Sequence, residues 1–227
     1  MFSGKFSARP MGDSVGEWCR PISSIGGAEI GQRQRVPCFY TAGVRIVAGT
    51  ARGLKLNAPV GSATRPTSDR VREALFNSLN SMGLLWDARV LDLFAGSGAL
   101  GIEALSRGAL DCTFVELRPE AIASIELNLQ TTKLADHATV IRSDVMRARA
   151  ELFSGADLVL ADPPYDFDGW SELLELMNDV TLVAESNRSL EFPGGWDVLK
   201  ERRYGDTVIH IVSAPPVESF DLLEKTQ

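Results

Sequence analysis

The sequence predicts an α/β fold in which buried, mainly parallel strands alternate with helices. The first observation is the stretch 89–101, where a short apolar run passes through a glycine-rich turn into a helix that stops at Gly108. The second is that three more short apolar runs follow, at residues 112–116, 138–144 and 157–161, each with an acidic residue at or just after its end. A strand, a glycine turn and a helix form the first half of a βαβ unit, so we expect a Rossmann-like sheet.

The glycine turn carries Gly96, Gly98 and Gly101 at GxGxxG spacing, which alone is a weak signal because many such strings only permit tight packing. Asp92 precedes the turn and would repel the pyrophosphate of a dinucleotide, which disfavours a NAD-dependent oxidoreductase. S-adenosylmethionine (SAM) has a sulfonium, an ammonium and no phosphate. The order Asp-x-Phe-x-Gly-x-Gly resembles the first motif of SAM-dependent methyltransferases, so we assign Asp92, Phe94, Gly96 and Gly98 to a SAM site.

Composition limits the alternatives. The chain has 227 residues, of which 44% are hydrophobic, enough for one domain with a sizeable core. We expect no membrane span and no secretory signal, because no apolar run approaches about 20 residues. Cys19, Cys38 and Cys112 are odd in number and form no CxxC, which predicts no zinc site or disulfide framework and favours the cytoplasm. The net charge of −7 disfavours non-specific nucleic-acid binding but allows a local basic patch.

The N-terminal part divides into two segments. Residues 1–43 are rich in glycine and proline and show no period of 2 or 3.6, so we expect a disordered extension. The alternative is a substrate-contacting arm that uses Arg33 and Arg35. Residues 44–63 are expected to form a small β element with strands at 45–49 and 53–56.

A basic block follows on a predicted helix that starts near residue 69. Its core-facing stripe consists of Val71, Ala74, Leu75, Ser78, Leu79 and Met82. Arg70 and Arg72 lie off this stripe. Residues 44–80 hold six basic and only two acidic residues, so we predict that Arg65, Arg70 and Arg72 contact RNA phosphates. The alternative is a solvated helix face.

Two acidic residues end the strands after the glycine turn. Glu116 follows Gly98 by 18 residues, a place in a βαβ unit where an acid can accept both ribose hydroxyls. An ordinary strand-end carboxylate is the alternative. Asp144 ends the next strand and could meet the adenine amino group of a nucleoside or cap the segment from Val145, and both roles could hold.

The string Asp162-Pro163-Pro164-Tyr165 follows the strand at 157–161. Two prolines fix the backbone and remove two N–H donors, which leaves carbonyl oxygens as acceptors. A carboxylate and an aromatic ring beside these acceptors suit a planar base with an exocyclic amino group. We therefore predict that all four residues are catalytic, with Asp162 and the Pro163 carbonyl holding the amine and Tyr165 stacking on the base. The alternative is a rigid turn after a strand.

The rest of the chain predicts a helix at 170–178 and strands at 180–184, 197–201 and 208–212, the last two paired as a hairpin. His210 lies in the middle of a strand and is expected to serve packing. Residues 64–216 would then form the main domain and 217–227 a tail.

At these strings the chain resembles the RsmD family, SAM-dependent bacterial enzymes that methylate the N2 amine of a guanine in 16S ribosomal RNA. The resemblance covers about residues 44–213 and rests on residues 45–49, 65–73, 92–101 and 162–165. It implies a seven-stranded Rossmann-like sheet with one antiparallel strand, preceded by a small N-terminal β element. In such proteins the acids that match Asp92 and Glu116 hold SAM, the one that matches Asp144 lies near its adenine, and the residues that match 162–165 hold the target base.

The resemblance implies an rRNA (guanine-N2-)-methyltransferase that acts on 16S rRNA or the assembling small ribosomal subunit. We expect a monomer with no metal and no membrane contact. The nearest alternative is an adenine-N6 DNA methyltransferase, which is disfavoured because the sequence shows no additional target-recognition domain. A non-catalytic RNA-binding module is a further alternative. Two features depart from the family: residues 1–43 lie outside the resemblance, and residues 166–191 leave little room for a full helix.

Overall fold

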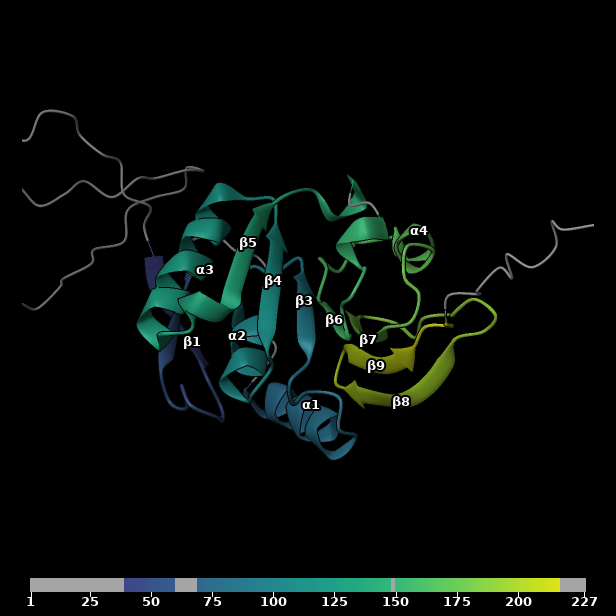
Figure 1. Cartoon of the computed structure of the whole chain (residues 1–227), viewed down its shortest axis with the longest axis horizontal. Helices are drawn as coiled ribbons and strands as arrows, with labels where there is room; N and C mark the ends of the chain where they lie inside the picture. The colour runs from purple at the N-terminus through teal and green to yellow at the C-terminus, as the bar shows by residue number, and fades with distance from the viewer. Residues whose placement is uncertain (1–38, 60–68, 148–149, 217–227) are drawn as a thin grey trace, which may run out of the picture. The chain divides into compact units, whose positions relative to one another are not determined.

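The computed structural model describes residues 39–59, 69–147 and 150–216 (Figure 1). Its main sheet has seven strands in the order β5-β4-β3-β6-β7-β9-β8, and only β9 runs antiparallel to its neighbours. The expected sheet with one antiparallel strand is therefore confirmed. The strands are β3 (Arg89–Leu93), β4 (Asp111–Glu116), β5 (Ala138–Arg142), β6 (Leu158–Ala161), β7 (Thr181–Ser186), β8 (Asp197–Tyr204) and β9 (Thr207–Ser213).

Helices cover both faces of the sheet, because successive strand side chains point to opposite faces. In β3, Val90 joins one apolar cluster and Leu91 joins the other. The first cluster includes side chains from α1 (Asp69–Ser81), α2 (Ala99–Ser106) and α3 (Pro119–Thr132), and the second includes side chains from α4 (Trp170–Leu174). None of the described helices is long and apolar enough to cross a membrane.

The sheet topology places the predicted motifs at one edge. From β3 the chain adds β4 and β5 on one side, then returns to add β6 and β7 on the other side. Ligands of open α/β sheets bind at this reversal, beyond the carboxyl ends of the strands. Leu93 of β3 pairs with Ala161 of β6, so Phe94 and Asp162 leave the sheet side by side.

The small β element differs from the expectation. Its strands are β1 (Phe39–Arg45) and β2 (Lys55–Pro59), so the strands predicted at 45–49 and 53–56 are misplaced, and the element begins before Val44. Most of residues 46–54 form turns. Ile46 is buried there against the main core. The apolar residues near it in the sequence therefore reflect packing of a turn and do not mark a strand. Of the expected disordered extension 1–43, residues 1–38 lie outside the described residues, and residues 39–43 belong to β1.

Two other elements differ in detail. Helix α1 buries Arg72, Leu75, Phe76 and Leu79, so its inner face is rotated from the predicted stripe, and Met82 is exposed. Helix α4 ends at Leu174, short of the predicted 178. The β8–β9 hairpin is confirmed. The predicted tail at 217–227 lies outside the described part.

Candidate active site

The glycine turn between β3 and α2 has an unusual backbone conformation. Phe94, Gly96 and Gly98 have positive φ angles of 56°, 57° and 77°. The third glycine, Gly101, serves close packing, because a Cβ there would lie 2.4 Å from the ring of Phe114 on β4. The predicted order of strand, glycine turn and helix is confirmed.

Asp92 lies beneath this turn with only 1% of its surface exposed. Its Oδ2 accepts a hydrogen bond from the Gly101 N–H at 2.9 Å. The pKa of this carboxyl is raised to about 8, chiefly by burial; the Gly101 hydrogen bond lowers it, and the nearby Glu116 carboxylate adds to the rise. At neutral pH Asp92 therefore carries a proton, and a cationic ligand at the turn would favour its loss.

Glu116 at the end of β4 faces the same turn and is 6% exposed. Its Oε2 accepts the Gly96 N–H at 2.8 Å, and its Oε1 accepts the N–H groups of Leu117 at 3.0 Å and Arg118 at 2.9 Å. The carboxylate is thus held rigidly beside the glycine turn. The hydroxyl groups of a ribose bound there would donate to the remaining lone pairs of the carboxylate or replace some of these N–H donors.

Asp144, beyond β5, caps a short 3₁₀ segment. Its Oδ1 accepts the Met146 N–H at 3.0 Å, and its Oδ2 lies 3.8 Å from the Arg147 Nε. The capping alternative is confirmed, since the 3₁₀ turn Val145–Arg147 begins at the next residue and its Met146 N–H is bound by Asp144. The side chain is half-buried at the sheet edge, so its contact with an adenine stays a prediction.

A pocket lies at the carboxyl ends of β6 and β7. Asp162 is half-buried, Pro163 is buried, and Pro164 and Tyr165 are exposed. The pocket is lined by Pro163, Pro164, Tyr165, Phe167, Trp170, Glu185, Ser186 and Asn187. Phe94 of the glycine turn packs edge-on against Phe167 with ring centroids 5.1 Å apart, so the pocket adjoins the turn.

Glu185 is a pocket residue that the sequence analysis did not identify. It lies in β7, is 5% exposed and lines the pocket. A signal was present, because the apolar run 180–184 is followed by an acid in the same way as the runs before Glu116 and Asp162.

The prediction that Arg72 contacts RNA is wrong. Its side chain is 1% exposed, and its guanidinium pairs with Asp69 at 2.9 Å, lies 3.7 Å from Glu103, and donates to the Arg45 carbonyl. A buried guanidinium with these partners is part of the core. Arg70, two residues earlier, is exposed and remains a candidate, whereas Arg65 lies outside the described residues.

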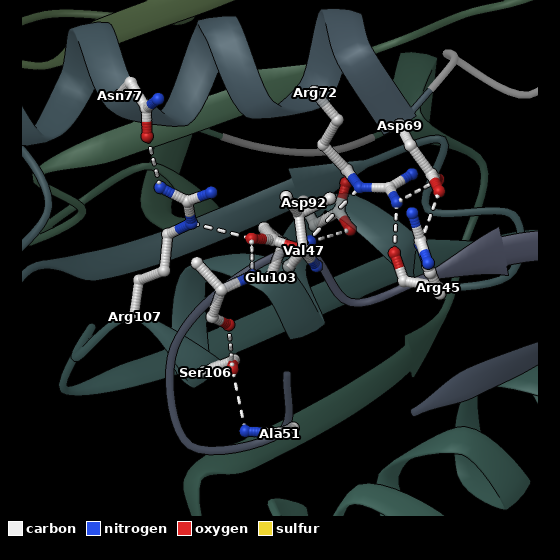
Figure 2. A network of polar contacts seen from close by, with 12 residues as sticks. Arg45, Val47, Ala51, Asp69, Arg72, Asn77, Asp92, Glu103, Ser106 and Arg107 are labelled. Carbon is white, nitrogen blue, oxygen red and sulfur yellow. Dashed lines mark hydrogen bonds and ion pairs between the residues drawn. The ribbon is translucent and has the colours of Figure 1, made fainter. Parts of the chain in front are cut away.

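A buried polar network joins α2 to the turn that follows β1 (Figure 2). The Glu103 carboxylate has no exposed surface and accepts the N–H groups of Val47 at 2.7 Å and Ala48 at 3.0 Å. Arg107 lies on its other side, with Nε 2.6 Å from the carboxylate. Glu103 thus holds the small β element against the helix that begins at the glycine turn.

Asn128 of α3 connects the small β element directly to the glycine turn. Its Oδ1 accepts the Asn57 N–H at 2.8 Å, and its Nδ2 donates to the carbonyls of Asn57 and Ser97, both at 2.9 Å. The side chain is fully buried, and no local sequence pattern predicts this role. The turn is therefore fixed from three sides, by Asp92, Glu116 and Asn128.

No group of three or more His, Cys, Asp or Glu side chains within the described ranges is arranged to hold a metal ion. Cys112 is a buried free thiol, and burial raises its pKa well above the ordinary value, which makes it unreactive.

Known proteins with similar sequences or structures share this architecture. The family model described as "Conserved hypothetical protein 95" matches residues 44–213. YlbH of Bacillus subtilis is 40% identical over 182 residues, which cover 74% of this chain and 97% of YlbH. "Ribosomal RNA small subunit methyltransferase D" of Escherichia coli K12 is 35% identical over 178 residues, covering 74% of this chain and 88% of that protein. The solved structure of yhhF from Escherichia coli matches with a TM-score of 0.65 at 33% identity, covering 76% of this chain and 98% of that chain. The chain therefore belongs to the Conserved hypothetical protein 95 family, the RsmD family that its motifs resemble.

Proposed function

We propose that this protein is a SAM-dependent methyltransferase that methylates the exocyclic N2 amine of a guanine in 16S ribosomal RNA. The observation that carries the proposal is the adjacency of the two motifs. The glycine turn and the Asp162–Tyr165 loop leave paired strands side by side, and Phe94 contacts Phe167 between them. The curated relative in Escherichia coli, named for rRNA methylation, supports an RNA substrate over a DNA adenine.

The residues around the glycine turn fit SAM. When bound, SAM supplies an electrophilic methyl group on a sulfonium. Glu116 would accept the ribose hydroxyls, Asp144 would lie near the adenine amine, and the backbone of Gly96 and Gly98 would face the amino-acid part. Asp92 is buried under the turn, so its contribution comes from orienting Gly101 and from its charge once its proton is lost.

The pocket loop supplies the chemistry toward the base. An aromatic amine is a poor nucleophile because its lone pair is delocalised into the ring. Asp162 and the Pro163 carbonyl would accept hydrogen bonds from the amine, which favours a more tetrahedral nitrogen and stabilises positive charge as it develops. Tyr165, which is 47% exposed, would stack on the extruded base.

The exposed basic residues near the small β element would hold RNA phosphates. Arg45, Arg52, Lys55 and Arg70 are all exposed. Arg70→Glu should weaken RNA binding and flatten its salt dependence, because RNA binding releases fewer counterions when a phosphate contact is lost. SAM affinity should stay at the wild-type value. An unchanged RNA affinity and salt slope would show that Arg70 belongs to a solvated helix face.

The proposal is tested by incubating the full chain with isotope-labelled SAM and three acceptors: 16S rRNA, small ribosomal subunits and DNA. Nucleoside mass spectrometry should detect N2-methylguanosine in an RNA acceptor and no methylated adenine in DNA. Label only in DNA, or in none of the acceptors, would overturn the proposal.

The cofactor site is tested separately by calorimetry with SAM alone. Glu116→Ala removes the acceptor for two ribose hydroxyls and should raise the Kd for SAM by about tenfold or more. Glu120→Ala is the matched control, because it removes an exposed carboxylate from the first turn of α3 and should leave the Kd for SAM unchanged. Equal SAM affinity in wild type and Glu116→Ala would remove Glu116 from the cofactor site.

A further inference from the structure

We propose that Glu185 is a specificity residue that selects guanine over adenine by accepting the N1–H of the bound base. The inference rests on the proposed function, because it concerns the base held by the Asp162–Tyr165 loop. It assigns a role to a carboxylate outside the four residues of that loop.

The sheet register places Glu185, which lines the pocket, beside Asp162, the residue before the lining residue Pro163. Strands β6 and β7 are parallel, with Ala161 opposite Ala184, so Asp162 and Glu185 occupy the next position on each strand. Glu185 is fixed on its other side, where it pairs with Ile209 of β9. Because neighbouring strands lie about 4.8 Å apart, the side chains of both residues start close enough together to reach one bound base.

The pocket holds Glu185 in a defined setting. Only 5% of its surface is exposed, and it lines the pocket with Pro163, Pro164 and Tyr165. Two residues on, Asn187 donates from Nδ2 to the Tyr165 carbonyl at 3.2 Å and ties the end of β7 to the loop. A carboxylate in the lining of a base pocket offers hydrogen-bond acceptors to the N–H groups of a bound base.

The chemistry of the two purines makes this pair of carboxylates selective. Guanine presents two adjacent kinds of donor on its Watson–Crick edge, the N2 amine and N1–H. Adenine presents one amine and an N1 lone pair. An ionised carboxylate only accepts hydrogen bonds, so Asp162 on the amine and Glu185 on N1 would bind guanine and repel adenine.

The test uses a synthetic RNA that spans the guanine mapped by mass spectrometry with the wild-type enzyme, and a copy with 2-aminopurine at that position. 2-Aminopurine keeps the N2 amine but has a lone pair at N1. Wild type should methylate the guanine RNA with a kcat/KM at least 100-fold higher than the 2-aminopurine RNA, because a site built for a donor rejects a base that lacks it. Glu185→Gln offers an amide N–H to the N1 lone pair of 2-aminopurine. It should lower the ratio of the two kcat/KM values at least tenfold.

Two controls separate the outcomes. Glu191→Gln removes the same charge from an exposed residue outside the pocket lining and should leave the ratio unchanged. SAM affinity by calorimetry should be equal in all three proteins. The inference is overturned if Glu185→Gln leaves the ratio of the two kcat/KM values unchanged. It is also overturned if the wild-type enzyme methylates both RNAs equally, and that result does not depend on whether a variant folds. A wild type that leaves guanine N2 unmodified overturns the proposed function instead.

Discussion

Arg70 and Arg72 show how far two residues on one helix can differ in role. They are separated by a single position, yet Arg70 is exposed and Arg72 is 1% exposed. Arg72 faces Asp69 and the fully buried Glu103, so its charge is part of a buried network. Removal of Arg72 takes away one of the two cations beside the buried Glu103, and loss of a partner from a buried ion pair is strongly destabilising.

We therefore expect Arg72→Met to lower the free energy of unfolding by about 3 kcal/mol, although methionine preserves most of the side-chain volume. Arg70→Met is the matched control and should change it by less than about 0.5 kcal/mol. Urea denaturation of both variants measures the difference. Equal stability of the two variants would show that the buried pairs of Arg72 contribute nothing net.

Asp92 should make stability depend on pH. Its folded pKa of about 8 lies above the ordinary value of 3.8. Between these two pH values the folded protein holds a proton on Asp92 that the unfolded chain has already released. This group therefore lowers the free energy of unfolding as pH rises from about 4 to about 8. Asp92→Asn keeps an acceptor for the Gly101 N–H, and its stability relative to wild type should increase from pH 5 to pH 9. Denaturation at both pH values checks this, and a constant difference would contradict the raised pKa.

Asp162 should contribute to the rate of methyl transfer more than to binding. Its carboxylate would meet the amine where positive charge develops, an interaction stronger in the transition state than in the ground state. Asp162→Asn places an amide donor against the amine, and we expect a rate loss on the order of 100-fold. Single-turnover methylation at saturating SAM and RNA is the measurement. A variant that reacts at close to the wild-type rate would remove Asp162 from the amine site.

At the scale of elements, the contact between the small β element and α2 depends on the absence of a side chain. A Cβ on Gly49 would lie 1.7 Å from the Ser106 carbonyl oxygen. Ser106 also donates from Oγ to the Ala48 carbonyl and accepts the Ala51 N–H, so the turn and the end of α2 meet backbone to backbone. Helix α2 is buried at every residue from Leu100 to Ser106.

Gly49→Ala and Gly53→Ala separate this close approach from backbone strain. Both glycines have positive φ, at 82° and 84°, but a Cβ on Gly53 meets nothing within 4 Å. Gly53→Ala should cost only the strain of about 1 kcal/mol, whereas Gly49→Ala should cost clearly more, because a backbone contact must open. Thermal unfolding compares them. Matching melting temperatures would mean that the turn moves away from α2 without loss.

The elements of the sheet could be predicted because each strand is a short apolar run and each site acid follows one. The placement of the glycine turn beside the 162–165 loop depends on the pairing of β3 with β6, which no single run contains. The small β element was misplaced because the apolar residues near Ile46 are buried in a turn, and hydrophobicity does not distinguish the two. Arg72 was misassigned because its partner Glu103 lies on another helix, a contact that no local pattern contains.

For the whole molecule, the chain order and the sheet order disagree at one end. Strand β9 is the last strand of the described chain, yet it lies between β7 and β8. All six residues of β7 are buried, and one of its edges pairs with β9. Until β9 has joined, β7 has open backbone groups and uncovered apolar side chains.

This arrangement has a consequence for translation. A nascent chain leaves the exit tunnel from its N-terminus, so the glycine turn and the 162–165 loop are available before β9 has been synthesised. The strand that carries Glu185 gains its second neighbour only when residues 207–213 emerge. The wall of the pocket that Glu185, Ser186 and Asn187 line therefore gains its second strand neighbour only after the other six strands of the sheet have left the ribosome.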